Sequence, residues 1–221
     1  MRLPSATEPP LALGTRPPRH APILPHLNAL GRLGPSGDTR GVIVRRERPG
    51  APADADVIRA VHTAAFQSAG SPDGTPVEAP LVDALRADDG WLPRLSLVAV
   101  VEDRVVGHVV CTRGWISTGA ATDVAVLGLG PLGVVPVHQG CGVGTALMHA
   151  VLGAADALDE PLVALLGDPR YYGRFGFRPA VAHGITAPDP TWGPHFQVRP
   201  LAACDPALAG AFRYAAPFAR V

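Results

Sequence analysis

The segment that decides the fold runs from Leu127 to Phe177 and reads LGLGPLGVVPVHQGCGVGTALMHAVLGAADALDEPLVALLGDPRYYGRFGF. Its pattern is typical of a strand, a glycine-rich loop, a helix, a second strand and a turn that holds two adjacent tyrosines. Such a loop presents bare backbone N–H groups at the start of a helix, where an anion binds. The tyrosines add a titratable group further along the same segment. The segment therefore predicts an anion site with a candidate acid.

The helix and the second strand of this segment have clear apolar patterns. Residues 143–158 carry apolar side chains on one side at helical spacing, namely Leu147, Val151, Leu152, Ala155 and Leu158. Leu162–Leu166 is a continuous apolar run, as expected for a buried parallel strand. Strand, helix and strand in this order predict a right-handed crossover unit.

Further elements are predicted on both sides of this segment. The pattern predicts a first strand over 42–45, a helix that Asp54 caps, a Pro/Gly loop over 71–76 and a second helix over 77–87. Two β-rich runs, 95–102 and 105–111, are joined at Glu102, Asp103 and Arg104 in a tight hairpin, and a third run covers 122–135. The tail, 186–221, is expected to hold one or two strands.

Residues 1–40 differ in composition from the rest of the chain. Prolines recur there without any apolar period, so the segment cannot bury enough surface to offset its ordering entropy. We expect a disordered leader over 1–40 and one folded domain over 41–221. The alternative is that the true start of translation lies further along the chain.

Composition excludes several functions. The 221 residues are 47% hydrophobic and 17% charged with zero net charge, which indicates a soluble globule without an electrostatic footprint for nucleic acid or an anionic membrane. No apolar run is long enough to span a bilayer. All 19 basic residues are Arg, so a lysine-dependent phosphate loop and Schiff-base chemistry are excluded. The three cysteines, Cys111, Cys141 and Cys204, form no paired motif, which indicates no disulfide framework, no metal site and a cytoplasmic location.

The glycine loop does not match a dinucleotide fingerprint. Counting from Gly140, the position of the last required glycine is occupied by Thr145. The acidic residue nearest to the end of the next strand is Asp168, and Pro169 follows it at once. A nucleotide-dependent oxidoreductase is therefore a weak alternative.

The spacing Gln139-x-x-Gly142-x-Gly144 fits another family better. Together with the later run LLGDPRYYGRFGF, over 165–177, it resembles the GCN5-related N-acetyltransferases, and most of all a bacterial subgroup with a Gly-Asp-Pro-x-Tyr-Tyr signature. The likeness covers about residues 41–221. It implies an α/β fold with a central, mostly antiparallel mixed sheet, a splayed parallel pair of strands and flanking helices.

The resemblance also implies how acetyl-CoA is held. The pyrophosphate of coenzyme A would meet backbone amides of Gln139, Gly140, Cys141, Gly142, Val143, Gly144 and Thr145. The thioester carbonyl would meet main-chain N–H groups at Leu132, Gly133 and Val134. Glycines at 128, 130 and 133 suggest a bulge in this strand that frees such donors. One oriented donor of this type is worth about 2.7–4 kcal/mol in a transition state.

Tyr172, four residues before Gly176, occupies the family's position for the general acid that protonates the departing thiolate. Tyr171 is expected to point elsewhere and to pack. For the general base, Glu78 is the preferred candidate, although the same residue could be only a favourable charge in the first turn of a helix. Asp123, His108 and His183 are further candidates, and a packed or solvated role is the more common one for a histidine such as His108.

The function implied is transfer of an acetyl group from acetyl-CoA to a primary amine of a small molecule or a protein, by direct attack. The alternative is a catalytically inactive module that binds acyl-CoA. Family members often form homodimers, so a homodimer is a further expectation. The loops around 67–80 and 115–122 and the segment 192–196 are expected to select the acceptor, but none carries a decodable signal.

Overall fold

The computed structural model describes residues 41–48, 52–67 and 76–220; the expected leader and most of the Pro/Gly loop at 71–76 lie outside these ranges. In chain order, the helices and strands are β1 (Ile43–Arg46), α1 (Pro52–Phe66), α2 (Glu78–Arg86), β2 (Ser96–Val101), β3 (Arg104–Ser117), β4 (Val124–Val134), α3 (Val143–Asp156), β5 (Leu162–Leu166), α4 (Pro169–Tyr172), β6 (Arg178–Pro179), β7 (Ile185–Thr186), β8 (Phe196–Pro200) and β9 (Gly210–Tyr214). Short 3-10 turns connect several of them.

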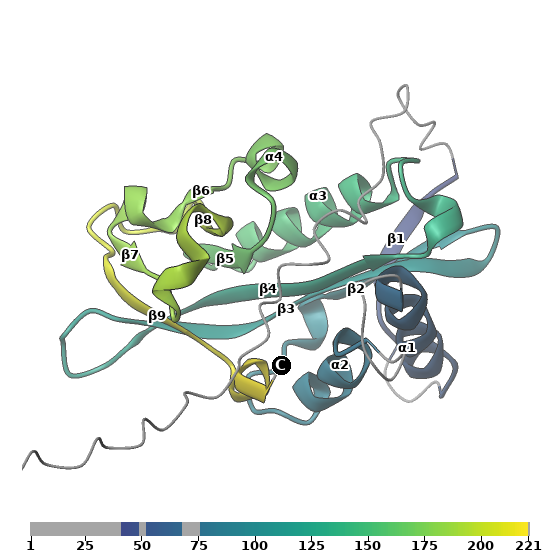
Figure 1. Ribbon diagram of the computed structural model, residues 1–221, viewed down its shortest axis with the longest axis horizontal. Helices are drawn as coiled ribbons and strands as arrows, with labels where there is room; N and C mark the ends of the chain where they lie inside the picture. The colour runs from purple at the N-terminus through teal and green to yellow at the C-terminus, as the bar shows by residue number, and fades with distance from the viewer. Residues whose placement is uncertain (1–40, 49–51, 68–75, 221) are drawn as a thin grey trace, which may run out of the picture.

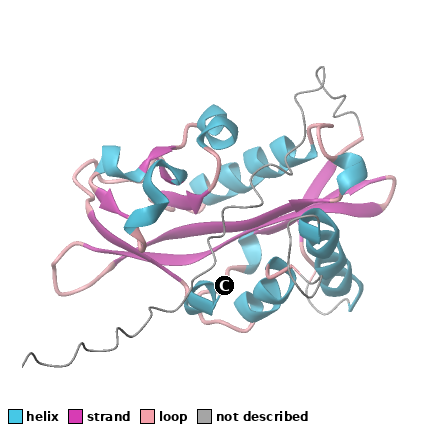
Figure 2. Ribbon diagram, in the orientation of Figure 1, coloured by secondary structure: helices cyan, strands magenta, loops and turns pink. Residues whose placement is uncertain are grey.

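The strands form a single mixed sheet. Its main path is β1-β2-β3-β4-β5-β8-β6, and β9 pairs with the far end of β3 and with β7. Only β4–β5 and β7–β9 are parallel among these pairs. Figure 1 shows α1 and α2 on one side of the sheet and α3 and α4 on the other, and Figure 2 shows the long strands running between these layers. The predicted mostly antiparallel sheet with one central parallel pair and flanking helices is confirmed.

Local sequence patterns explain most of the elements. The β2–β3 hairpin turns at Glu102 and Asp103, whose φ angles are 46° and 61°, so both central residues adopt the left-handed conformation of a two-residue turn. β3 continues to Ser117, beyond the predicted end at residue 111. Residues 114–116 continue the antiparallel ladder with β4 on one edge, and residues 114–117 pair with β9 on the other. The extension of β3 therefore has one partner nearby in sequence and one from a distant part of the chain.

The main core lies between α3 and the sheet. The apolar stripe of α3 is fully buried, with Leu147, Met148 and Val151 at 0% exposure. These side chains pack against apolar residues of β2, β3, β4 and β5. On the other side of the sheet, Ile58 of α1 and Val82 of α2 pack against Val98. The crossover from β4 through α3 to a parallel β5 is present as predicted.

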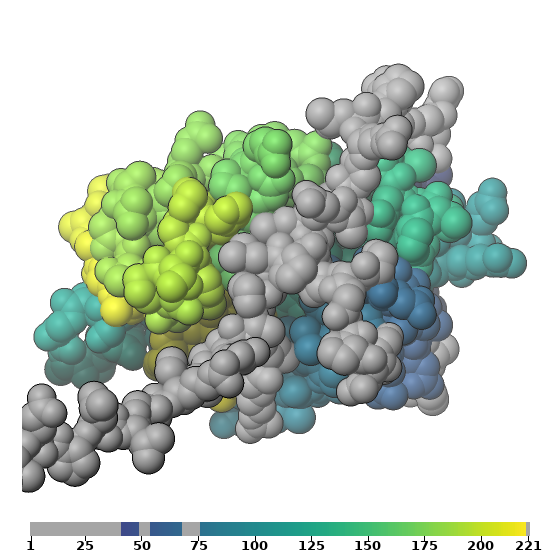
Figure 3. Space-filling model, in the orientation of Figure 1, coloured from purple at the N-terminus to yellow at the C-terminus, as the bar shows by residue number. Residues whose placement is uncertain are grey.

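The C-terminal segment forms a second, aromatic core. β8 pairs with β5 and β6, while β9 pairs with β3, which agrees with the prediction of one or two strands in the tail. Phe196 of β8 and Phe212 of β9 meet with ring centroids 5.3 Å apart. In the space-filling view of Figure 3, most of the residues from 175 to 214 gather at the left end and α1 lies at the right. No helix in the described part of the chain is both long and apolar enough for a membrane span.

One local prediction was wrong. Asp54 does not precede α1 as its cap but lies inside the first turn of the helix. Its carboxylate accepts hydrogen bonds from Arg45 at 2.7 and 3.0 Å and from the backbone N–H of Arg48 at 2.9 Å. These bonds hold the pKa of Asp54 below its ordinary value, with the Arg45 hydrogen bond as the largest cause. Asp54 therefore ties α1 to β1 and to the residues that follow β1.

Candidate active site

The parallel strands β4 and β5 separate after a short contact. They pair at Leu127–Val163 and Gly128–Ala164, and within the described residues the rest of β4 has no strand partner on the β5 side. The edge of β4 from Leu129 to Val134 therefore faces a gap between the two strands. This arrangement is the predicted splayed parallel pair.

β4 carries the predicted bulge at this position. Leu132 pairs with Val109 and Leu129 pairs with Cys111, so β4 has one more residue than β3 between these two pairs. The additional length falls at Gly130–Pro131, where Gly130 has a φ of 149° that only glycine adopts readily. The bulge interrupts the alternation of N–H directions along β4, and a new alternation begins at Leu132.

Beyond the bulge, the backbone geometry directs two N–H groups toward the gap. The N–H of Val135 donates to the carbonyl of Val106 on β3 at 2.9 Å. Successive N–H groups of a strand point in opposite directions. The N–H groups of Val134 and Leu132 therefore point away from β3, and that of Gly133 points toward it. Two of the three residues predicted to meet a carbonyl oxygen thus direct their donors into the gap.

The glycine loop lies next to this edge. Gly140 and Gly142 have φ angles of 73° and 83°, in the left-handed region that favours glycine, and α3 begins immediately afterwards at Val143. The first N–H groups of α3 lack partners within the helix and form a positive end suited to an anion. The side chain of Gln139 donates from Nε2 to the carbonyl of Val134 at 2.9 Å, which fixes the loop to the end of β4.

Tyr171 and Tyr172 have different surroundings. The Tyr171 hydroxyl lies against the first turn of α3: a Cβ built on Gly144 would stand 2.7 Å from its oxygen. The guanidinium of Arg174 lies 4.1 Å from the centre of the Tyr171 ring. Burial raises the pKa of Tyr171, and Arg174 opposes this effect. Tyr171 is therefore placed at the start of the loop helix.

Tyr172 is buried in the main core, with an exposed fraction of 8%. Its ring contacts Tyr171 edge-on, and it lies so close to Gly167 at the end of β5 that any side chain there would overlap it. Its hydroxyl makes no hydrogen bond within the described part of the chain. Burial, followed by the neighbouring Tyr171, raises the pKa of Tyr172 above that of an ordinary tyrosine.

The candidate bases predicted from sequence do not come together. Glu78 is buried in the first turn of α2, on the same side of the sheet as α1. Asp123 precedes β4 and forms an exposed ion pair with Arg213 at 3.2 Å. His183 ends the short turn between β6 and β7. His108 belongs to a different group of residues.

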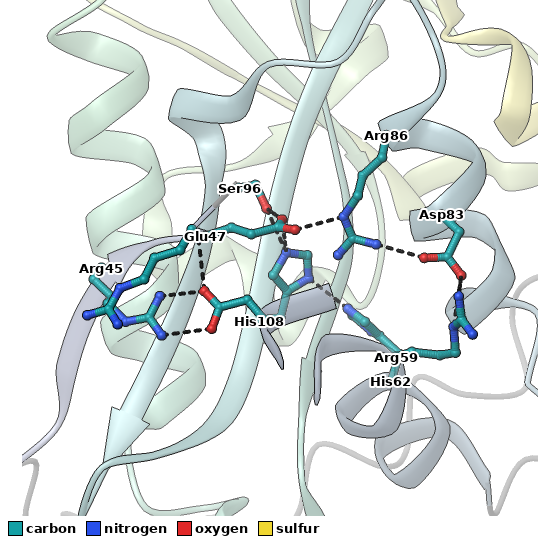
Figure 4. Close-up of polar contacts among 10 residues, drawn as sticks. Arg45, Glu47, Arg59, His62, Asp83, Arg86, Ser96 and His108 are labelled. Atoms are coloured by element: carbon teal, nitrogen blue, oxygen red, sulfur yellow. Dashed lines mark hydrogen bonds and ion pairs between the residues drawn. The ribbon is translucent and has the colours of Figure 1, made fainter. Parts of the chain in front are cut away.

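That group is a buried chain of polar side chains between α1 and the sheet (Figure 4). Nε2 of His62 lies 2.8 Å from Nδ1 of His108, and Nε2 of His108 lies 2.9 Å from the hydroxyl of Ser96. Ser96 donates to Glu47, whose other oxygen accepts from Arg86 at 2.8 Å. His62, His108 and Ser96 are each 0% exposed. Burial lowers the pKa of both histidines, that of His62 to about 3, so both are neutral at pH 7.

His108 is the one member of these hydrogen-bonded side chains that the sequence analysis named, and His62 is among those that it missed. His62 lies four residues after Ile58 and three before Ala65, both of which belong to the buried stripe of α1. A histidine at a stripe position was the available signal. What it contacts could not be predicted, because α1 must pack over β3 to bring His62 to His108, and the pairing of β2 with β3 then brings Ser96 to His108.

The described residues argue against the weaker alternatives. Asp168 caps α4 by accepting from the N–H of Arg170 at 2.9 Å, so its carboxylate serves the turn rather than a ribose. The described residues contain no group of three or more His, Cys, Asp or Glu side chains that could hold a metal ion. What they contain is a gap with two directed donors, an anion loop and two tyrosines.

Together these features define the acetyltransferase class. The family model described as an acetyltransferase (GNAT) domain matches residues 47–180, and the chain belongs to this family. Two curated relatives from Escherichia coli strain K12 are named uncharacterized N-acetyltransferases. YjhQ is 35% identical over 74% of this chain and 88% of its own length, and YhbS is 34% identical over 72% and 87%. This chain is thus similar to proteins named as enzymes, which does not favour the inactive alternative.

Two solved structures share the fold. A GNAT family acetyltransferase from Brucella melitensis in complex with acetyl-CoA has a TM-score of 0.62 and 32% identity, over 80% of this chain and 97% of that one. YhbS from Escherichia coli in complex with CoA has a TM-score of 0.69 and 31% identity, over 81% and 92%. The likeness extends over almost the full length of both proteins.

Proposed function

We propose that this protein transfers an acetyl group from acetyl-CoA to a primary amine by direct attack. The observation that carries the proposal is the gap beside β4, into which Leu132 and Val134 direct their N–H groups next to the glycine loop. Acetyl-CoA would supply an activated thioester and a diphosphate. The two solved structures that contain acetyl-CoA or CoA support this choice of donor.

The residues of the site fit this donor. The N–H groups between Gln139 and Thr145 would hold the diphosphate, in a loop whose left-handed turns at Gly140 and Gly142 require glycine. Leu132, Gly133 and Val134 would line the thioester, with the first and the last donating to the carbonyl oxygen as negative charge develops there.

Tyr172 is proposed as the acid that protonates the leaving thiolate. Its raised pKa keeps the hydroxyl protonated at neutral pH, as an acid requires. Tyr171 would instead contribute to the wall beside the diphosphate loop, because its hydroxyl lies against Gly144. Glu78 is the base that the sequence favoured, and Glu78→Gln is its direct test.

Several finer assignments belong to the same proposal. The chain would belong to the bacterial subgroup with a Gly-Asp-Pro-x-Tyr-Tyr signature, which the run at 167–172 supports. The acceptor would be an amine of a small molecule or a protein, the enzyme would be cytoplasmic and homodimeric, and residues 1–40 would be a leader outside the catalytic domain 41–221.

The test is a screen for thiol release from acetyl-CoA across drug-like amines, amino acids and peptides with free N-termini. Turnover with at least one amine, together with a larger thermal shift by acetyl-CoA than by NAD, is the expected result. A shift by NAD alone would instead support the oxidoreductase. Binding of acetyl-CoA without turnover of any class would favour the inactive module.

A further inference from the structure

The polar chain between α1 and the sheet ends on an atom that has no partner. Nδ1 of His62 is buried and makes no hydrogen bond within the described residues. It faces β4: a Cβ built on Gly133 would stand 2.7 Å from it. A buried nitrogen without a partner costs stability, typically about 1–3 kcal/mol. A functional role for Nδ1 of His62 would explain why this cost is tolerated.

The hydrogen bonds from His62 to Glu47 determine which ring nitrogen of each histidine carries the proton. Glu47 forms an ion pair with Arg86 and, as a carboxylate, can only accept a hydrogen bond. Ser96 therefore donates its proton to Glu47 and accepts one from Nε2 of His108. Nδ1 of the neutral His108 must then accept from Nε2–H of His62. This leaves Nδ1 of His62 with a lone pair, directed at Gly133.

This lone pair lies under the part of β4 that would hold the thioester. Gly133 lies between Leu132 and Val134, whose N–H groups point into the gap, and it pairs with His108 across the β3–β4 ladder. Since Gly133 has no side chain, Nδ1 of His62 lies directly against the backbone of β4. The acceptor nitrogen must come close to the same carbonyl carbon when it attacks.

We propose that His62 removes the proton from the ammonium group of the acceptor, directly or through one water molecule, and that His108, Ser96 and Glu47 relay this proton away. The proposal rests on the proposed acetyl transfer and adds to it a base that the sequence did not reveal. It also assigns the acceptor class, because a relay that removes a proton before attack serves amines that are charged at neutral pH.

The protons and bonds balance. The ammonium proton passes to Nδ1 of His62, while Nε2–H of His62 passes to Nδ1 of His108. Nε2–H of His108 passes to Ser96, and the hydroxyl proton of Ser96 passes to Glu47, from which it leaves to water because the Glu47 side chain is 11% exposed. The free amine then forms the C–N bond as the C–S bond breaks. Tyr172 protonates the thiolate, and the second amine proton restores the tyrosine. After product release, water in the emptied site takes the proton from Nδ1 of His62 while Glu47 takes one up from water, so the relay runs back and both rings again carry their proton on Nε2.

The electrostatics favour neutral histidines at rest. The charged groups that face the pair are Glu47, after β1, and Arg86 of α2, while Gly133 of β4 adds no charge. After burial itself, Arg86 is a further cause that lowers the pKa of His62. A proton is therefore not retained on the imidazoles, and transfer to Glu47 keeps positive charge out of the core.

The first test needs no substrate. In ¹⁵N spectra of the histidine-labelled protein at pH 7, assigned with the His62→Gln and His108→Gln variants, both rings should carry their proton on Nε2 and none on Nδ1. In Ser96→Ala, His108 loses its acceptor and its Nε2 signal should change, while CoA affinity stays the same. A proton on Nδ1 of His62 in the wild-type protein would overturn the proposal, whether or not an acceptor is known.

The second test uses the acceptor from the screen and analogues of it with progressively lower amine pKa. His62→Gln should lower kcat/KM about 10²-fold or more for amines that are charged at the assay pH. The loss should shrink toward unity as the amine pKa falls below that pH, because neutral amines need no base before attack. His183→Gln, in the turn between β6 and β7, should behave as wild type.

The outcomes separate the two proposals. An equal loss for every amine would reduce His62 to a structural role, and a selective loss in Glu78→Gln alone would make Glu78 the base. If the wild-type protein turns over no amine, the proposed function fails, while the proton positions on His62 and His108 still decide the relay.

Discussion

The Tyr171 hydroxyl lies against Gly144, so that a Cβ at residue 144 would stand 2.7 Å from the tyrosine oxygen. The two residues come from the two motifs of one segment, the glycine loop and the paired tyrosines. Their contact means that the anion loop is closed on one side by an aromatic ring, which Arg174 covers at 4.1 Å. The site therefore has little spare volume at the start of α3.

Replacing Gly144 with Ala should weaken binding of CoA by about tenfold or more, which corresponds to roughly 1.4 kcal/mol. The added methyl group must displace the Tyr171 ring or cover the N–H groups of the loop. Isothermal titration with CoA measures the effect. Gly153→Ala is the matched control, because the same helix has open space at that position. Equal affinities of the two variants would contradict the assignment of the loop.

Replacing Tyr172 with Phe should lower kcat by roughly 10²–10⁴-fold and leave CoA affinity nearly unchanged, because only the proton donor is removed. Tyr171→Phe should have the smaller effect on kcat. Thiol release and a CoA titration on both variants provide the comparison. An unchanged kcat in Tyr172→Phe would exclude this residue as the acid.

The pH dependence offers a separate check on Tyr172. Burial raises its pKa above the ordinary tyrosine value of about 10, so the hydroxyl stays protonated over a wider range than usual. The kcat of the wild-type enzyme should therefore show no fall from loss of this acid up to about pH 10. A fall centred near pH 8 that disappears in Tyr172→Phe would contradict the buried environment.

Local patterns predicted the parts of the fold that local interactions determine. Leu162–Leu166 is apolar throughout because both faces of β5 are covered, and the stripe of α3 faces the sheet at helical spacing. The bulge in β4 was predicted because glycines at 128, 130 and 133 weaken the regular pairing of a strand, and Gly130 adopts the positive φ at which the bulge falls. Each of these features can be read within about fifteen residues of sequence.

The remaining features depend on distant parts of the chain. Residues 114–116 lie in β3 between β4 and β9, and β9 comes almost a hundred positions later, so the pattern of either strand alone does not reveal that second pairing. His62 and His108 meet because α1 packs over β3 at one register. The placement of the two tyrosines likewise depends on packing, since the Tyr172 ring lies over Gly167 and the Tyr171 hydroxyl lies against Gly144.

Cys141 should serve as a reporter of the loop. It is exposed next to the N-terminus of α3, whereas Cys111 is fully buried and Cys204 is intermediate. A thiol alkylator should label Cys141 quickly, and desulfo-CoA should slow that labelling by covering the loop. Peptide mapping by mass spectrometry follows each cysteine separately. Cys204 is the internal control, because its labelling should not respond to the ligand; slow, ligand-independent labelling of Cys141 would contradict the prediction.

Asp54→Asn should destabilise the fold by roughly 1.5–3 kcal/mol at pH 7, since Asp54 accepts charge-assisted hydrogen bonds from Arg45. The folded pKa of Asp54 is lowered, so its contribution is complete above the unfolded pKa of about 4 and is lost as pH falls through the lower folded pKa. Urea unfolding of both proteins at several pH values should show this difference shrinking only in strong acid. Asp123→Asn, which removes an exposed pair with Arg213, should cost at most about 1 kcal/mol. Equal losses in the two variants would show that burial of the Arg45–Asp54 pair adds nothing to the attachment of α1.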